Sequence, residues 1–250
     1  MRPGAQRAGA AARGPAVLML AASMIALLPA PTAALPLTPA GPGETPAPPW
    51  RFVGLPNQTL PKTGFSVVEV DGARALRIES AGSYGNLVHP VSGPARQLAW
   101  RWRLERPLAA ADLRRKNADD AALKVCAMFE LDLDVLPFWE RQALRLARTL
   151  SGEPLPPATL CYVWDSSLPA GTVLPNVYTG RMRWMVLQGA GAATGQWTAE
   201  RRDVMADFRR VFGEEEAAAR PTLVAIAVGA DADNTGGRAL GYVADPVLTP

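Results

Sequence analysis

Oxygen-bearing side chains near residue 231 are spaced in a way that could bind a cation. Asp231, Asp233 and Asn234 lie within four positions, and two glycines follow Thr235. Alternating carboxylate and amide oxygens beside glycines suit a hard cation such as Ca²⁺. The twelfth position of such a loop, where a bidentate glutamate is needed, is Tyr242. The segment therefore favours a polar turn whose side chains bond their own backbone, with calcium at Asp231 and Asp233 as the alternative.

Two adjacent carboxylates, Asp119 and Asp120, could take part in acid–base chemistry. Neighbouring carboxylates raise each other's pKa, which suits proton transfer, and they also suit a cation. The arginines of residues 113–118 offer a plain ion pair as the alternative. A glycoside hydrolase would need a second carboxylate, such as Glu130, about 5–9.5 Å from Asp120.

Basic side chains stand opposite apolar ones in several segments with strand-like alternation. Arg101, Lys124 and Arg181 are of this kind, and Glu130 shares the strand face of Lys124. If these strands are neighbours, one sheet face carries clustered cations that suit the carboxylates of acidic sugars or phosphates. The alternative is an ordinary solvated sheet face with cross-strand ion pairs.

Aromatic rings could stack on a sugar. Trp164 is the candidate for this role, with Tyr162 on the same strand face, whereas Trp100 and Trp102 share a face with leucines and are expected in the core. Arginine and lysine would bind anionic groups, and carboxylates would bind hydroxyls. Together the expected ligand-binding residues are Arg101, Asp119, Asp120, Lys124, Glu130, Tyr162, Trp164, Tyr178, Arg181, Asp233 and Asn234.

Strands must position most of these residues. The clearest period-two alternation runs over Gln97–Leu104, and Asp71-Gly72 predicts a hairpin turn. Two segments with helical spacing, Val135–Leu150 and Asp203–Phe212, interrupt the strands. The remaining predicted strands are Phe65–Val70, Ala73–Ser80, Leu123–Leu131, Thr159–Trp164, Met182–Gln188, Thr222–Val228 and Gly241–Leu248. We predict an all-β, mainly antiparallel fold, a β-sandwich or jelly roll with one or two helical insertions.

The amino-terminal segment has the pattern of a secretory signal. Three arginines precede an apolar run, Ala16–Leu28. At about 1.5 Å per residue this run is too short to cross a bilayer as a helix. Small residues up to Ala34 suit cleavage there, so residues 1–34 are predicted to be a signal peptide, with an uncleaved anchor as the alternative.

The remainder of the chain is electrically neutral. The sequence has 26 Lys and Arg against 23 Asp and Glu, and three of the basic residues lie in residues 1–34. A nucleic-acid partner is therefore not expected. Residues 35–49 are proline-rich and are predicted to be a linker, which leaves residues 50–250 as a single domain. We expect an exported protein, periplasmic or extracellular, without a stable membrane span after cleavage.

The two cysteines, Cys126 and Cys161, lie on predicted strands that flank the first helical segment. Export permits a disulfide between them, but Cys126 shares its face with Lys124 and Cys161 shares one with Val163, which leaves the bridge open. The single histidine, His89, excludes a His-rich metal site and argues against a Ser-His-Asp triad. No cofactor is expected beyond the calcium alternative.

A set of short motifs extends from Trp50 to Val247. They are Trp100-Arg101-Trp102, Asp119-Asp120, Tyr162-Val163-Trp164, Asn176-Val177-Tyr178-Thr179, and the segments Trp197–Asp203, Asp207–Gly213 and Asp231–Thr235. As a set they resemble a bacterial secreted family of unknown function, domain-of-unknown-function family 3047. Lys124 stands where that family usually has arginine, and Leu136–Leu150 is longer than usual. The resemblance implies a domain type without a settled activity, and the closing strands are similar in architecture to jelly-roll carbohydrate-binding domains.

These patterns favour an exported β-sandwich that binds a glycan or another polar or anionic ligand without transforming it. The first alternative is a polysaccharide hydrolase, with Asp120 and Glu130, or a lyase, with Tyr178 beside Arg181. The second is an envelope module whose partner is another protein, which an exposed apolar patch without a polar groove would favour.

Overall fold

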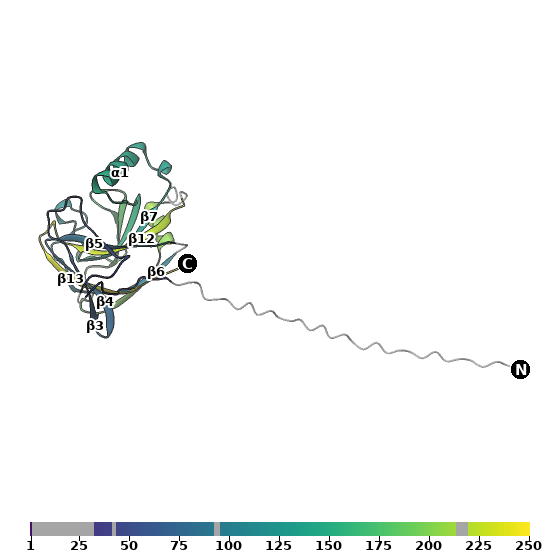
Figure 1. Cartoon of the computed structure of the whole chain (residues 1–250), viewed down its shortest axis with the longest axis horizontal. Helices are drawn as coiled ribbons and strands as arrows, with labels where there is room; N and C mark the ends of the chain where they lie inside the picture. The colour runs from purple at the N-terminus through teal and green to yellow at the C-terminus, as the bar shows by residue number, and fades with distance from the viewer. Residues whose placement is uncertain (2–32, 42–43, 93–95, 214–219) are drawn as a thin grey trace.

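The computed structural model of the protein describes residues 1, 33–41, 44–92, 96–213 and 220–250. These residues form two β-sheets that pack face to face (Figure 1). The first sheet consists, in spatial order, of β11 (Thr198–Asp203), β6 (Gln97–Arg106), β13 (Arg238–Thr249), β4 (Ala73–Ala81) and β3 (Gly64–Val70), with β1 (Ala33–Ala34) paired to β13. The second consists of β2 (Arg51–Val53), β5 (Tyr84–Pro90), β12 (Thr222–Asp231), β7 (Leu123–Glu130), β8 (Ala158–Trp164), β10 (Met182–Gln188) and β9 (Val173–Pro175).

The connections are those of a mainly antiparallel sandwich. In the described parts of both sheets, β8 and β10 form a parallel pair and the other neighbouring strands run antiparallel. The helices are α1 (Phe138–Ser151) and α2 (Val204–Phe212), with short 3-10 turns at Lys116–Ala118 and Leu133–Val135. The predicted all-β sandwich with two helical insertions is confirmed.

Local sequence explains the turns and caps of these elements. Asp71 and Gly72 have φ angles of 51° and 74°, the left-handed pair that a tight hairpin between β3 and β4 needs. The Asp203 carboxylate accepts hydrogen bonds from Met205 N and Ala206 N at 3.1 and 2.9 Å and so caps α2. Gly152, at φ 66°, ends α1.

The main core lies between the two sheets. The alternation of β6 buries Trp100 and Trp102, as expected from their leucine neighbours. Their rings lie 5.4 and 5.6 Å from those of Tyr162 and Trp164 in the opposite sheet. This aromatic layer fixes β8 against β6, because large rings bury the most apolar area per residue.

A second apolar layer covers the outer face of the second sheet. It includes Cys126, Cys161 and Trp184, together with Leu113 from the segment that precedes β7. Every residue of β8 is consequently buried, on both faces of its sheet. The solvated sheet face, which was the alternative for the strand of Lys124, does not fit the buried Lys124 and Cys126, because loops and α1 lie over this part of β7.

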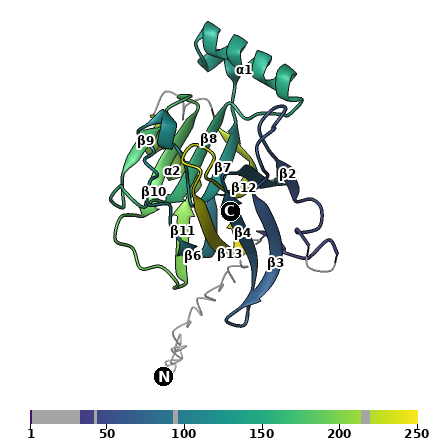
Figure 2. The same ribbon diagram turned by 90° about the vertical axis from the view of Figure 1, so that its left-hand side faces the viewer.

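Helix α1 lies at one end of the sandwich, above the ends of β7 and β12 (Figure 2). Leu144 is its one buried residue, while Phe138, Trp139, Leu146 and Leu150 are exposed. The helix thus presents an apolar stripe that the fold does not cover.

The predicted linker is not a free tether. Leu35 and Leu37 are buried in the main core, and Trp50 donates a hydrogen bond from Nε1 to Pro36 O at 3.0 Å. Leu35 N also donates to Pro246 O at 2.9 Å. Proline-rich composition predicted extended backbone without contacts, but two leucines in it are enough to dock the segment on the domain.

The predicted signal peptide falls mainly on residues 2–32, which lie outside the described residues. In the part of the chain that the structure does describe, no helix is long and apolar enough to cross a membrane.

Candidate functional site

A cavity of about 590 Å³ lies between the outer face of the second sheet and α1. Strands β5, β7, β8 and β12 contribute to its floor, and α1 and the segments 155–156 and 178–182 contribute its walls. Its polar lining includes Tyr84, Asn86, Lys124, Tyr178, Thr179 and Arg181. Its volume is within the range of about 300–1,000 Å³ that is usual for small-ligand sites.

Lys124 lies on the floor of this cavity and is only 4% exposed. Its Nζ donates to Asp231 Oδ1 at 3.0 Å and lies 5.2 Å from the centre of the Tyr84 ring. Asp231 Oδ1 also accepts from Ala121 N at 3.0 Å. The carboxylate and the ring compensate a buried ammonium, and nearby carboxylates raise the pKa of Lys124 despite its burial.

Asp119 is a buried carboxyl beside this pair. Its Oδ2 accepts from Asn176 Nδ2 at 2.7 Å, while Oδ1 is buried without a hydrogen-bond partner in the described part of the chain. Burial raises the pKa of Asp119 to about 6, and the charges of Asp231 and Asp120 act in the same direction. Asp119 therefore gains or loses its proton in mildly acidic solution.

Asp120 organises the loop after β12. Its Oδ1 accepts from Asn234 N at 3.0 Å, and its Oδ2 accepts from Thr235 N and Oγ1 at 2.8 and 2.5 Å. The amide of Asn234 donates to Asp119 O at 3.3 Å. The paired aspartates thus tie the segment before β7 to the loop that carries Asp233.

Tyr178 links this network to the cavity wall. Its hydroxyl donates to Lys116 O at 2.7 Å and lies 3.3 Å from Asn234 Oδ1. The Asn176 side chain shapes the loop, because its Oδ1 accepts from Tyr178 N at 2.9 Å. The Tyr178 side chain is 61% exposed overall, so one side of the ring is open to a ligand.

At the α1 side of the cavity, Arg181 pairs with Glu140. Arg181 Nη1 lies 3.2 Å from Glu140 Oε2, and both side chains are largely buried. Trp139, one residue earlier in α1, also lines the cavity and is 67% exposed. This side therefore offers an ion pair and an open indole ring.

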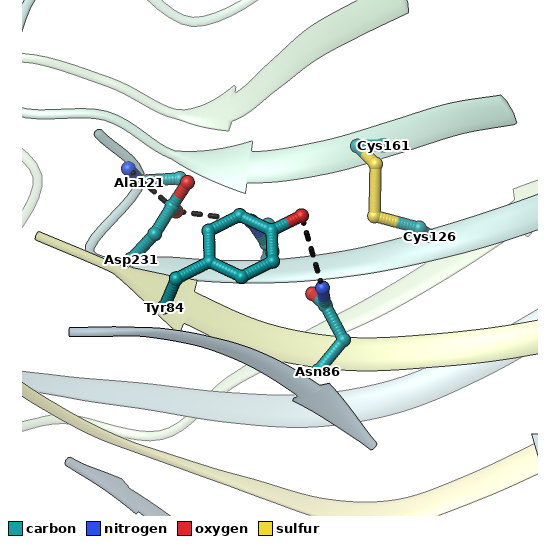
Figure 3. Close-up of a disulfide and its surroundings, with 7 residues drawn as sticks. Tyr84, Asn86, Ala121, Cys126, Cys161 and Asp231 are labelled. Carbon is teal, nitrogen blue, oxygen red and sulfur yellow. Dashed lines mark hydrogen bonds and ion pairs between the residues drawn. A yellow bond between two sulfur atoms is a disulfide. The ribbon is translucent and has the colours of Figure 1, made fainter. Parts of the chain in front are cut away.

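The disulfide Cys126–Cys161 forms part of the cavity floor. The two residues are directly opposite each other on antiparallel strands β7 and β8. Figure 3 shows the bridge on the strands beside Tyr84 and Asn86, whose side chains are joined by a hydrogen bond of 3.4 Å from Asn86 Nδ2 to Tyr84 Oη. The bridge that the sequence left open is present.

Over residues 48–247 the chain matches the family described as "Protein of unknown function (DUF3047)". The chain belongs to this family. The resemblance carried by the short motifs is confirmed, and the DUF3047 match covers both helices, the strands from β2 to β12 and most of β13. No curated protein matches this DUF3047 chain.

Three solved structures are similar to the DUF3047 chain at low identity. The K2 cleaved adhesin domain of Lys-gingipain is 10% identical, with a TM-score of 0.39 over 88% of this chain and 98% of that one. The catalytic domain of Humicola grisea Cel12A, in complex with a soaked thio cellotetraose, is 15% identical, with a TM-score of 0.41 over 79% and 91%. The xyloglucanase domain of NopAA, a type three effector from Sinorhizobium fredii, in complex with cellobiose, is 9% identical, with a TM-score of 0.39 over 89% and 98%. Because each TM-score is below 0.5, these similarities carry no argument about the ligand.

The DUF3047 fold brings most of the predicted site residues together. The polar network of contacts unites Asp119, Asp120, Lys124, Tyr178 and Asn234. Asp233 lies in the same loop as Asn234. Of the predicted residues, Lys124, Tyr178 and Arg181 line the cavity. Four predicted residues lie elsewhere.

Tyr162 and Trp164 do not line the cavity, because they point into the core between the sheets. Their side chains are almost fully buried, and Tyr162 donates to Asp207 Oδ2 at 2.9 Å. Odd and even residues of β8 were both apolar, so the sequence did not show which of its faces met the core. The expected stacking role of Trp164 does not fit this position.

Arg101 and Glu130 are also outside the polar network. Arg101 lies on the outer face of the first sheet and pairs with Asp245 at 2.5 Å. Glu130 shares the outer face of β7 with Lys124, as expected, but it lies six residues farther along and pairs with Arg148 of α1 at 3.2 Å. The expected cluster of Arg101 with Lys124 on one face is wrong, since the two residues belong to different sheets.

Sequence reasoning missed several residues of the site, among them Tyr84, Asn86 and Trp139. Tyr84 and Asn86 come from β5, which was not predicted because the segment has glycine, asparagine and a terminal proline instead of a β-branched run. Trp139 was placed in the helix, but its exposure was not foreseen. The spacing of Trp139, Leu146 and Leu150 on one helix face could have indicated it.

Three carboxylates are close enough to hold a metal ion by distance alone. Oxygens of Asp120, Asp231 and Asp233 all lie within 4.8 Å of one another. However, both oxygens of Asp120 already accept hydrogen bonds, and the Lys124 ammonium contacts Asp231. The contacts fit the polar turn that the sequence favoured, and calcium at Asp231 and Asp233 stays the alternative.

Proposed function

We propose that the cavity under α1 binds a sugar-containing ligand without transforming it. The observation that carries this proposal is a cavity of about 590 Å³ that combines open aromatic rings with paired polar groups. Trp139 and Tyr178 supply rings at its walls, and Tyr84 supplies one at its floor. Sugars present both apolar ring faces and hydroxyl groups, so such a lining suits them.

The charges of the cavity support a neutral or weakly charged sugar. The Lys124 ammonium is already compensated by Asp231, and Arg181 pairs with Glu140. A compensated pair still offers N–H donors and carboxylate acceptors to hydroxyl groups. A fully anionic ligand would have to compete with these carboxylates.

The predicted signal peptide and the disulfide support export as the setting of this function, because disulfides persist in oxidising compartments. An exported binding protein meets glycans of the envelope or of its surroundings.

Two neighbouring aromatic residues of α1 provide the test. Trp139 and Phe138 are equally exposed, at 67% and 68%, but only Trp139 lines the cavity. We expect Trp139→Ala to weaken glycan binding about tenfold, the effect of losing about 1.4 kcal/mol of ring contact, and Phe138→Ala to leave it unchanged. Calorimetric titration with neutral and acidic oligosaccharides, with circular dichroism to check folding, measures both.

Equal affinity of the two variants and the parent chain would contradict a site at the cavity. A failure of the parent chain to bind any sugar in a broad array would contradict the function itself.

A lyase is a second candidate, because Tyr178 and Arg181 line the same cavity. In such an enzyme a tyrosine transfers the proton and a cation stabilises the uronate carboxylate. The parent chain and the two variants are incubated with uronate polymers, and the ultraviolet absorbance of an unsaturated product is measured. The hydrolase pair Asp120 and Glu130 has no such support, because at about 3.3 Å per residue β7 separates them by roughly 20 Å or more.

A further inference from the structure

We propose that the ligand is an amphiphile, with its polar head beside Tyr84 and Tyr178 and a linear apolar tail that extends to Val224. This inference rests on the proposed function and names its ligand class. A second cavity, beside the first one, carries the argument.

The second cavity has a volume of about 240 Å³ and lies on the same outer face of the sheet. Its apolar lining includes Val53 of β2, Val88 of β5 and Val224 of β12. Met128, Leu155 and Pro156 line both cavities, so the two cavities adjoin at these residues. We treat the two as compartments of one site.

The floor along β7 runs from the charged Lys124, through Cys126, to the apolar Met128, and the Glu130 carboxylate follows at the rim. Lys124, Cys126 and Met128 line the first cavity, and Met128 and Glu130 line the second. Residues two apart on a strand face are about 6.6 Å apart, so this floor is roughly 20 Å long. The neighbouring strands follow the same order, with Asn86 and then Val88 on β5. A ligand that matches this gradient is polar at one end and apolar at the other.

A second sugar unit would not suit the second cavity. Its charged groups are paired at the rim, Arg51 with Glu153 at 2.7 Å and Glu130 with Arg148 at 3.2 Å. Sugar hydroxyls that lose water against valine, proline and methionine side chains are left without partners, which is unfavourable. Methylene groups gain free energy in the same place.

The apolar surface continues outside the cavities. On α1, Trp139 lines the first cavity, and Leu146 and Leu150 follow on the same helix face with 59% and 67% exposure. Apolar side chains of α1 therefore lie beside the first cavity, where the tail of an amphiphile can contact them.

A series of alkyl glucosides tests the proposal. Methyl, butyl, hexyl and octyl glucoside are titrated into the purified chain below their micelle concentrations. Each methylene that is buried is worth about 0.8 kcal/mol, so affinity is expected to rise about fourfold per methylene until the second cavity is filled.

Matched variants locate the tail. Val224→Gln in the second cavity is expected to flatten the dependence on tail length, whereas Val68→Gln, at another half-buried valine in β3 of the opposite sheet, leaves it unchanged. Leu150→Ser reports on the exposed helix face and is expected to leave the dependence unchanged as well.

The results separate this inference from the proposed function. Equal affinity for methyl and octyl glucoside overturns the amphiphile but leaves sugar binding intact. The amphiphile proposal is also overturned if Leu150→Ser abolishes the dependence on tail length and Val224→Gln leaves it intact, because the tail is then on the helix surface. If neither Trp139→Ala nor sugar competitors weaken the binding of octyl glucoside, the proposed function is contradicted. If Val224→Gln flattens the dependence of affinity on tail length, the second cavity is supported as the place of the tail.

Discussion

Individual side chains decide the electrostatics of this site. Four carboxylates, those of Asp119, Asp120, Asp231 and Asp233, surround one ammonium, that of Lys124. Their total charge cannot be compensated by one lysine. Burial raises the pKa of Asp119, Asp231 and Asp233, so protons reduce the excess negative charge as the pH falls.

We predict that Asp119 makes the folded chain less stable as the pH rises from about 4 to about 6. Its pKa is 3.8 in the unfolded chain and about 6 in the folded one, so the folded state binds the extra proton in this window. Asp119→Asn removes this titration. The melting temperature of the variant, relative to the parent, is expected to be higher at about pH 7.5 than at about pH 4. The corresponding change in unfolding free energy has an upper limit of about 3 kcal/mol before solvent screening.

Thermal denaturation across the pH range measures this difference, and Asp245→Asn on the opposite sheet serves as the control. If the difference in melting temperature between Asp119→Asn and the parent does not depend on pH, the raised pKa of Asp119 in the folded chain is wrong.

At the scale of elements, the second sheet is stabilised by a covalent bond as well as by the hydrogen bonds between its strands. Cys126 and Cys161 join β7 and β8 across α1 and its connections, and the two cysteines are 35 positions apart in the sequence. Closing a loop of this length restricts the unfolded chain. The disulfide also forms part of the floor of the proposed site, so the same bond stabilises the sheet and shapes the site.

We predict that the double variant Cys126→Ala, Cys161→Ala loses about 3–4 kcal/mol of unfolding free energy, the loop-entropy value for 35 residues. Urea denaturation of the parent and the variant measures the loss, and the parent in reductant should behave as the variant does. A loss below about 1 kcal/mol would show that the disulfide adds little to the stability that the hydrogen-bonded strands already have.

At the scale of the whole molecule, residues 33–37 pack on the folded body. Leu35 and Leu37 are buried in the main core, and β1 pairs with β13 next to them. The predicted cleavage after Ala34 would keep both leucines in the mature chain.

We predict that a chain beginning at Trp50 is less stable than one beginning at Leu35 by about 3 kcal/mol or more, because two buried leucines are lost. Leu35→Ala with Leu37→Ala in the longer chain should reproduce most of the loss. Chemical denaturation of the three proteins checks it, and equal stability would restore the linker interpretation.

Part of the candidate site could be predicted from the sequence, because polar side chains stood out on the apolar strands and in the loops. Lys124, Tyr178 and Arg181 were named and line the cavity, and a polar network lies beside it. Asp119, Asp120, Tyr178 and Asn234 were named and do meet. Trp164 was named and lies in the core, because β8 is apolar on both faces and its pattern does not say which face is covered.

The sequence by itself determined the strand-rich sandwich and both helices, since period-two and helical patterns are local properties of the chain. Its short motifs carried the resemblance to the DUF3047 family. Only the tertiary structure decided which strands are neighbours. That choice places Arg101 and Lys124 in different sheets, brings Tyr84 from an unpredicted strand to Lys124, and sets the two cysteines opposite each other. Strand order depends on how faces of similar hydrophobicity pack across the whole molecule, and no local pattern in the chain specifies it.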